Sequence, residues 1–261
     1  MVFFFRSRLE QMKAYCITLN RSDPLRAQTA LREIQRLGVD CEFADGVDLK
    51  QHDLARLREL LTPRAFVELQ RGRQVHEALS GLGSVGCYLA HYRLWQRCAA
   101  GSEPIAIFED DVQFQADAPQ RVRALLDDAA AQRYDILRLI YMPMARGAAV
   151  SPLLERVAHG WSASAYVLQP RAAQLIVKHA LPMEMHCDYY LDFVSQQHGL
   201  QHYCPRVPLH INRALGSTIG HSALIAVEPA APRCSAAWVA LIGACLLALL
   251  LLVASLSWRP L

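Results

Sequence analysis

The sequence carries little excess charge, because 27 lysines and arginines face 24 aspartates and glutamates, which leaves a formal net charge of +3. The basic residues are scattered along the chain and form no continuous stripe. A protein whose main partner is nucleic acid concentrates positive charge on one surface to neutralise phosphates. The composition therefore argues against nucleic acid as a partner.

Paired cysteine motifs are also missing, since the eight cysteines stand apart and no CxxC occurs. This excludes a zinc ribbon and a thioredoxin-like motif. Cys87 and His91 have i, i+4 spacing, but the sequence offers no second His/Cys pair that would complete a zinc site, so zinc is rejected here. We expect buried, reduced thiols, which fit a reducing cytosolic compartment.

A hydrophobic export signal is lacking at the amino terminus, where the apolar stretch before Arg6 is far shorter than the roughly seven to fifteen residues of a signal peptide. Near the other end, residues 236–258 carry no charged side chain. As a helix this segment would be about 34 Å long, enough to cross a hydrocarbon core of roughly 30 Å. We predict a tail-anchored protein. Its body, residues 1–228, is expected on the cytoplasmic side of the membrane and is joined to the anchor by a linker at 229–235.

Apolar periodicity and breaker residues divide the body into alternating strands and helices. Alternation of this kind predicts an α/β domain with a mostly parallel central sheet. The expected strands are 14–19, 39–44, 105–108, 135–140 and 162–169, and the expected helices lie at about 25–37, 81–98, 119–131, 170 onward and 185–199, with a mostly helical region at 49–79.

Three adjacent carboxylates, Glu109, Asp110 and Asp111, follow the strand predicted at 105–108. Ligands of open α/β sheets bind beyond the carboxyl ends of the strands. Mg²⁺ and Mn²⁺ take oxygen ligands, often one or two carboxylates together with a substrate's phosphates. The triplet is therefore either a divalent-metal site or a solvated acidic turn.

Six segments taken together resemble glycosyltransferase family 25, which includes bacterial lipopolysaccharide galactosyl- and glucosyltransferases and collagen galactosyltransferases. They occur in order between about residue 14 and about residue 220, as "YCITLNRSDPLR", "EFADGVD", "SVGCYLAHYRLW", "PIAIFEDDV", "YDILRL" and "SASAYVLQPRAAQLIV". The resemblance implies a GT-A-type fold for nucleotide-diphospho-sugars. It also implies a UDP-sugar donor, Mn²⁺ or Mg²⁺ as cofactor, and inversion at the anomeric carbon.

The resemblance also implies roles for the acidic triplet. The family's DxD-like motif falls on Glu109–Asp111, with Asp111 as the direct metal ligand. Asp110 or Glu109 would act as a further ligand or contact the ribose.

Two further segments match the family at the predicted nucleotide site. Arg21 and Arg26 would reach the phosphates or order the loop, although surface ion pairs with Asp23 or Glu33 would explain them equally well. Asp45 and Gly46 would line the nucleotide pocket, or form a simple turn.

The family has an aspartate after the segment that matches "AYVLQPRAAQLI", so the resemblance implies Asp188 as the catalytic base, with Asp192 as the next choice four residues further along the same helix face. Helix capping is the alternative role for Asp188. The resemblance makes His91 an active-site residue, and a core histidine bonded to a backbone carbonyl is the other interpretation. Ala90 stands where the family commonly has serine, which removes a hydroxyl contact at this helix.

The predicted function is inverting transfer of galactose or glucose from a UDP-sugar to a lipopolysaccharide-type or other glycan or glycolipid acceptor at a membrane, such as the bacterial inner membrane. One alternative is a catalytically inactive, membrane-tethered sugar-nucleotide-binding or scaffold protein, which the intact acidic triplet disfavours. A metal-dependent phosphohydrolase would need an aspartate nucleophile or paired histidine ligands, and neither pattern is evident.

Overall fold

The computed structural model describes residues 12–49, 54–71 and 77–211, which all lie within one compact unit, Met1–Ala223. The predicted linker and the predicted anchor at 236–258 lie outside the described residues. Within the described ranges, no helix is both long enough and apolar enough to cross a bilayer.

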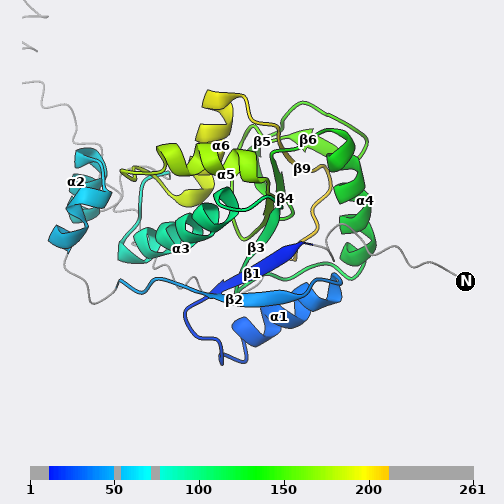
Figure 1. Ribbon diagram of the computed structural model, residues 1–261, viewed down its shortest axis with the longest axis horizontal. Helices are drawn as coiled ribbons and strands as arrows, with labels where there is room; N and C mark the ends of the chain where they lie inside the picture. Colours follow the sequence, from blue (N-terminus) through cyan, green and yellow to red (C-terminus); the bar gives the residue numbers. More distant parts are fainter. Residues whose placement is uncertain (1–11, 50–53, 72–76, 212–261) are drawn as a thin grey trace, which may run out of the picture. The chain divides into compact units, whose positions relative to one another are not determined.

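The described chain alternates between strands and helices, as the periodicity predicts (Figure 1). The strands are β1 (Lys13–Thr18), β2 (Cys41–Asp45), β3 (Ile105–Glu109), β4 (Ile136–Arg138), β5 (Met142–Ala145), β6 (Leu154–Arg156), β7 (His159–Trp161), β8 (Ala165–Leu168) and β9 (His202–Pro205). The helices are α1 (Ala27–Arg36), α2 (Pro63–Arg71), α3 (Leu82–Ala99), α4 (Ala118–Ala131), α5 (Pro170–His179) and α6 (Cys187–His198), with a 3₁₀ helix at Leu54–Leu60.

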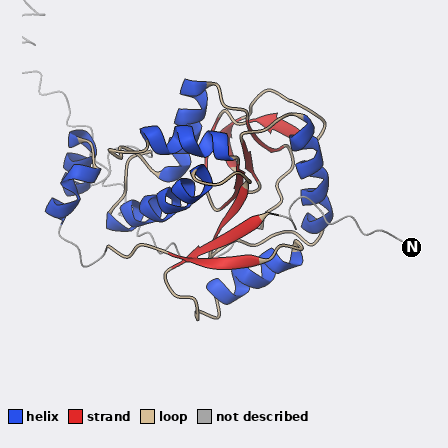
Figure 2. Cartoon of the chain, in the orientation of Figure 1, coloured by secondary structure: helices blue, strands red, loops and turns tan. Residues whose placement is uncertain are grey.

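Seven of the strands form one central sheet in the order β2-β1-β3-β8-β4-β9-β6. Figure 2 draws the strands in red and the helices around them in blue. β2, β1, β3, β4 and β9 run in one direction, whereas β8 and β6 run in the opposite direction. β5 and β7 form a separate antiparallel pair. The prediction of an α/β domain with a mostly parallel central sheet is therefore confirmed.

Side chains of the central strands alternate between two hydrophobic layers, because successive residues of a strand point to opposite faces. Ile105 and Ile107 pack with α3, α5 and α6 on one face. Ala106 and Phe108 pack with α1 and α4 on the other. The sheet is thus covered on both faces, which explains why its strands read as continuous apolar runs.

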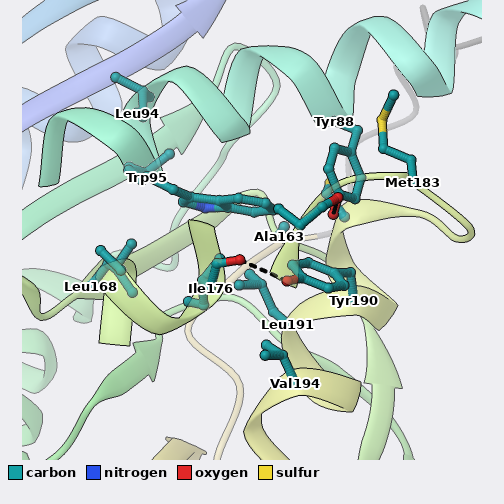
Figure 3. Close-up of a cluster of buried hydrophobic side chains, with 14 of the residues drawn as sticks. Tyr88, Leu94, Trp95, Ala163, Leu168, Ile176, Met183, Tyr190, Leu191 and Val194 are labelled. Carbon is teal, nitrogen blue, oxygen red and sulfur yellow. Dashed lines mark hydrogen bonds between the residues drawn. The ribbon is translucent and has the colours of Figure 1, made fainter. Parts of the chain in front are cut away.

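Helix α3 is fixed against α5 and α6 by an aromatic cluster (Figure 3). Trp95 is fully buried, with its ring centroid 5.4 Å from that of Tyr88 and 5.7 Å from that of Tyr190. Tyr190 in turn donates a hydrogen bond of 2.7 Å to the carbonyl of Ile176 in α5, drawn as a dashed line. This packing sets the position of His91, which lies one helical turn before Trp95.

Several element boundaries differ from those predicted. Thr62–Pro63 does not merely interrupt a helix, because Pro63 is the first residue of α2, a position that proline favours. The predicted strand 135–140 shortens to β4, and 162–169 shortens to β8. The sequence did not predict β5, β6, β7 and β9, since three- or four-residue strands are too short to establish an alternating pattern.

Gly86 allows α3 to approach the segment that follows β2, and it generates a stability prediction. A Cβ atom at this position would lie 2.1 Å from the carbonyl oxygen of Val47. We expect Gly86→Ala to lower the free energy of unfolding by about 1–3 kcal/mol, the usual range for overpacking, as measured by urea denaturation.

Gly101 is the matched control, because a Cβ there would meet its nearest atom at an ordinary 3.6 Å. Gly101→Ala should change stability by no more than about 0.5 kcal/mol. Equal effects of the two substitutions would contradict the close approach of α3 to Val47.

Candidate functional site

A pocket lies at the carboxyl ends of β1 and β3. This is where the topology of an α/β sheet places ligands. Its walls come from the ends of β1 and β3, the start of α1, the segment after β2, and one face of α3. The lining residues are Ile17, Thr18, Leu19, Arg26, Gly46, Val47, Asp48, Gly83, Cys87, Ala90, Glu109, Asp110 and Asp111.

Glu109 points toward α3 because it has the same parity along β3 as Ile105 and Ile107, which pack on that helix. Its Oε1 lies 3.0 Å from Nε2 of His91. The imidazole is fully buried, and its Nδ1 lies 2.9 Å from the hydroxyl of Tyr166. His91 is therefore buried but bonded to two side chains, and not to a backbone carbonyl as the core interpretation expected.

The tautomer of His91 follows from its neighbours. The indole N–H of Trp95 donates to the hydroxyl oxygen of Tyr166 at 2.7 Å. In the described part of the chain, Trp95 and His91 are the two hydrogen-bond partners of that hydroxyl. Since a buried O–H needs an acceptor, Tyr166 donates to Nδ1, and Nε2–H of His91 then donates to the carboxylate of Glu109.

Asp110 and Asp111 are held by residues of β1 and α1. Arg26 approaches Oδ1 of Asp110 through Nε at 3.0 Å and Nη2 at 2.9 Å, and its Nη2 also lies 3.4 Å from Oδ2 of Asp111. Thr18 donates its hydroxyl proton to the other oxygen of Asp110 at 2.7 Å. Asp23 fixes this arginine, because its carboxylate accepts the backbone N–H of Arg26. The three negative charges are tolerated because different elements supply their partners.

The negative charge of the Asp111 carboxylate is only partly compensated by neighbouring positive charge. Burial, together with the negative charge of Glu109, raises the pKa of the Asp111 carboxyl to about 6, although Arg26 opposes the shift. When a carboxylate is destabilised in its ionised form by its surroundings, a positive charge placed beside it stabilises that form strongly. This property fits a metal ligand.

Two other predicted residues pair with each other. Arg21 contacts Asp45 at 2.7 Å in an exposed ion pair. The partner in this pair is therefore Asp45, whereas the sequence suggested Asp23 or Glu33. Gly46 lines the pocket, while Asp45 does not. Five of the predicted site residues therefore line the pocket, namely Arg26, Gly46 and the three carboxylates.

The two predicted bases occupy different surroundings at the start of α6. Asp188 is half-buried, and its carboxylate accepts the backbone N–H groups of Ser162 at 3.1 Å and Tyr189 at 2.9 Å. Asp192 is buried and forms an ion pair of 2.8 Å with Arg138. Burial raises the pKa of Asp192 to about 6 despite this partner. Neither aspartate lines the pocket itself.

Arg138 is a structurally central residue that sequence reasoning missed. It is fully buried and donates to Asp192, to the carbonyls of Ser162 and Asp188, and to Nε2 of His202. Burial and the adjacent guanidinium lower the pKa of His202 well below its usual range. The available signal was an arginine inside the apolar run "YDILRL".

The cysteines also bear on a sequence inference. The six cysteines within the described residues are free thiols, as predicted. However, the structure brings Cys187 to the Cys87–His91 pair, with the two sulfurs 3.8 Å apart. Zinc was rejected because the sequence offers no second His/Cys pair, and the structure instead brings one further potential ligand to the first pair from 100 positions away.

The fold and the pocket define an α/β domain with an acidic ligand site at the carboxyl ends of its central strands. The profile of glycosyltransferase family 25, described as an LPS biosynthesis protein, matches residues 11–191 of this sequence, and the chain belongs to this family. The resemblance drawn from the six sequence segments is confirmed.

Relatives within the family differ in their named activity. Procollagen galactosyltransferase 1 of Danio rerio is 25% identical over 214 residues, covering 76% of this chain and 34% of its own length. A human protein named inactive glycosyltransferase 25 family member 3 is 27% identical over 203 residues, covering 73% of this chain and 33% of its own. The chain thus spans about a third of each relative.

A solved structure of apo UDP-glucose pyrophosphorylase is similar with a TM-score of 0.44 and 10% sequence identity, over 76% of this chain and 91% of that chain. This likeness adds nothing to the family assignment.

The buried Arg138–Asp192 pair generates a second stability prediction. Replacing Arg138 by methionine leaves a buried carboxylate and several carbonyls without their donor. We expect a loss of about 3–5 kcal/mol in the free energy of unfolding, measured by urea denaturation.

Arg64→Met serves as the control, because Arg64 pairs with Glu68 while 63% of its side chain is exposed. That substitution should cost less than about 1 kcal/mol. A loss for Arg138→Met as small as the control's would show that the buried network contributes nothing to stability.

Proposed function

We propose that this domain is an inverting, metal-dependent hexosyltransferase with a GT-A-type fold that moves galactose or glucose from a UDP-sugar to a glycan acceptor. The observation that carries the proposal is the convergence of Glu109, Asp110 and Asp111 in the wall of one pocket, together with Gly46 and Arg26. Membership of glycosyltransferase family 25 supports transferase chemistry. A relative named procollagen galactosyltransferase supports galactose as one donor sugar.

The pocket has two kinds of wall that suit a sugar nucleotide. Its carboxylate side lies at the ends of β1 and β3, and Arg26 adds a guanidinium for the phosphates while it holds Asp110 in place. The opposite side, Gly46–Asp48, packs against Gly86 of α3 and offers main-chain polar groups for the nucleoside.

The donor set fits a hard divalent cation, because three carboxylates converge and the pKa of Asp111 is raised by burial and by the negative charge of Glu109. Asp111 would bind Mn²⁺ or Mg²⁺ directly, with Asp110 or Glu109 as the second ligand. A cation held there would offset the negative charge that develops on the departing diphosphate. His91 donates to Glu109 and so orients that carboxylate toward the pocket.

Asp188 is our proposed base for the acceptor hydroxyl. Its carboxylate is held by two backbone N–H groups, and it follows Cys187, whose sulfur touches the pocket residue Cys87. Asp192 is the weaker candidate because it is buried and already forms an ion pair with Arg138. Asp188 lies inside the first turn of α6, whose N-cap is His186, so it does not take the capping role that the sequence left open.

The acceptor class rests on the predicted anchor. A membrane span at 236–258 would confine the domain to the plane of lipid-linked saccharides and raise their effective concentration. We therefore propose a lipopolysaccharide-type acceptor at the cytoplasmic face.

A second candidate is an inactive protein that binds sugar nucleotides, favoured by the relative that is named inactive. The two candidates share donor binding and differ in turnover. Incubation of the full-length protein with a panel of UDP-sugars, followed for release of UDP, separates them, because the transferase should slowly hydrolyse its own donor sugar.

Substitution of Asp111 tests the donor site. In the full-length protein in detergent, Mn²⁺ should increase UDP affinity, and Asp111→Asn should abolish that increase by weakening UDP binding with Mn²⁺ at least about tenfold, which is about 1.4 kcal/mol. Isothermal titration measures both affinities. Asp117→Asn is the control, because Asp117 is an exposed acid outside the pocket, and UDP affinity that is unchanged in Asp111→Asn would count against the metal site.

The same site should show a pH dependence. Protons and Mn²⁺ compete for Asp111, so its raised pKa of about 6 predicts that affinity for Mn²⁺ alone is full above pH 7. The affinity should fall roughly tenfold for each pH unit below 6. In Asp111→Asn the remaining affinity should no longer change around pH 6.

The base assignment makes a separate prediction. Asp188→Asn should lower the rate of UDP release from the donor sugar by about 100-fold or more, the usual contribution of a general base, while UDP affinity stays unchanged. A normal rate in Asp188→Asn combined with a reduced rate in Asp192→Asn would transfer the role to Asp192.

A further inference from the structure

Beneath the acidic pocket lies a second cluster of ligand atoms with a different chemistry. Cys87 and His91 come from α3, and Cys187 is the first residue of α6. Their ligand atoms lie within 4.8 Å of one another. Oε1 of Glu109 lies 3.0 Å from Nε2 of His91 and 3.8 Å from the sulfur of Cys87.

We propose that Cys87, Cys187 and His91 form a binding site for a thiophilic divalent cation such as Zn²⁺, with Glu109 as the nearest oxygen ligand. Thiolate and imidazole are the ligands that structural Zn²⁺ sites use, whereas Mn²⁺ and Mg²⁺ prefer carboxylates. The site therefore differs in metal class from the carboxylate site centred on Asp111.

The spacing of the atoms matches a tetrahedral centre. Two sulfurs each about 2.3 Å from a central Zn²⁺ are about 3.8 Å apart at the tetrahedral angle. The sulfurs of Cys87 and Cys187 are 3.8 Å apart. An ordinary disulfide has its sulfurs about 2.05 Å apart, so this pair already has the spacing that a shared metal requires.

Burial of the cation does not add net charge. Binding releases the two thiol protons, so that one divalent cation is balanced by the thiolates of Cys87 and Cys187. The charge of the cluster, that of the Glu109 carboxylate, stays the same. Burial raises the pKa of the Cys187 thiol, which a bound cation reverses by stabilising the thiolate.

Metal binding through Nε2 requires the opposite tautomer of His91 to the one in the metal-free site, so the hydrogen bond between Nδ1 and Tyr166 must reverse its direction. When Nε2 of His91 becomes a ligand, its proton moves to Nδ1, and the hydroxyl oxygen of Tyr166 lies 2.9 Å away as acceptor. Metal-binding histidines generally donate their other ring N–H in this way. On metal binding, the hydrogen bond that the Tyr166 O–H donates to His91 is lost, and bonds from the metal to two sulfurs and one nitrogen are formed.

The cation enters from the pocket, because Cys87 lines its wall. Once bound, it joins α3 to the first turn of α6, directly beside Asp188. It therefore acts as a clamp between the helix under the donor pocket and the helix that begins next to the proposed base.

Cobalt titration tests the site, because Co²⁺ replaces Zn²⁺ and absorbs light. The full-length protein, in detergent with a phosphine reductant and stripped of metal, is titrated with Co²⁺. We expect one equivalent to give a sulfur-to-cobalt charge-transfer absorption and strong tetrahedral d–d bands, which Zn²⁺ then abolishes. Zn²⁺ should also raise the melting temperature.

Serine variants assign the absorption to its ligands. Cys87→Ser and Cys187→Ser should each weaken Co²⁺ binding by more than roughly 100-fold, beyond the effect of losing a residue that only supports a ligand. Cys98→Ser should bind normally, since Cys98 is a buried thiol of the same helix that contacts the carbonyl of Leu168. Asp111→Asn should keep the sulfur absorption, which separates this site from the donor site.

A wild-type protein without sulfur-to-cobalt absorption would overturn the proposal, as would absorption that survives in both cysteine variants or disappears in Asp111→Asn. If the cysteine variants do not fold, the ¹¹³Cd chemical shift of the wild-type protein decides, because coordination by two sulfurs and coordination by oxygens alone give well-separated shifts. None of these measurements uses UDP, so their failure leaves the proposed transferase function untouched.

Discussion

The site depends on the compensation of three neighbouring negative charges at the end of β3. Glu109 accepts a hydrogen bond from His91 of α3, and Asp110 is bound by Thr18 of β1 and by Arg26 at the start of α1. None of these partners is close to the triplet in sequence. The acidic end of β3 is therefore stable only in the assembled domain, because an uncompensated cluster would repel itself and lose its hydration on burial. Asp111 is the least compensated of the three, which is why we propose it as the direct metal ligand.

Much of the fold follows from local sequence. Strands β1, β2 and β3 and helices α1, α3, α4, α5 and α6 all fall within a few residues of their predicted ranges, because each combines a clear apolar period with a Gly, Pro or polar boundary. The second half of the sheet was harder to predict. There β6 and β9 have only three and four residues, and β9 pairs with two segments that lie roughly fifty residues (β6) and sixty-six residues (β4) earlier in the chain. Such strands are stabilised by tertiary contacts that no local pattern records.

The site was predictable where residue type and strand ends coincide, as at Glu109–Asp111 and Gly46. Partners that depend on long-range packing were not predictable. In the sequence, Arg138 is a single charged residue within an apolar strand. Its contacts with Asp192 and His202 are 54 and 64 residues away along the chain, so the local pattern does not reveal them. Cys187 stands beside Asp188 in the sequence, yet its approach to Cys87 depends on how α6 packs against α3.

The direction of β8 explains how the two parts of the site come together. An antiparallel strand begins at the edge where its parallel neighbours end, so the residues that enter β8 lie beside the carboxyl ends of β3 and β4. Ser164 accepts the backbone N–H of Glu109, and Ser162 donates its own to Asp188. Ser162 holds a φ of 85°, which is costly for a residue with a side chain and is typically retained near functional sites. One short reversed strand thus joins the proposed metal ligand to the proposed base, and a strictly parallel sheet would separate them.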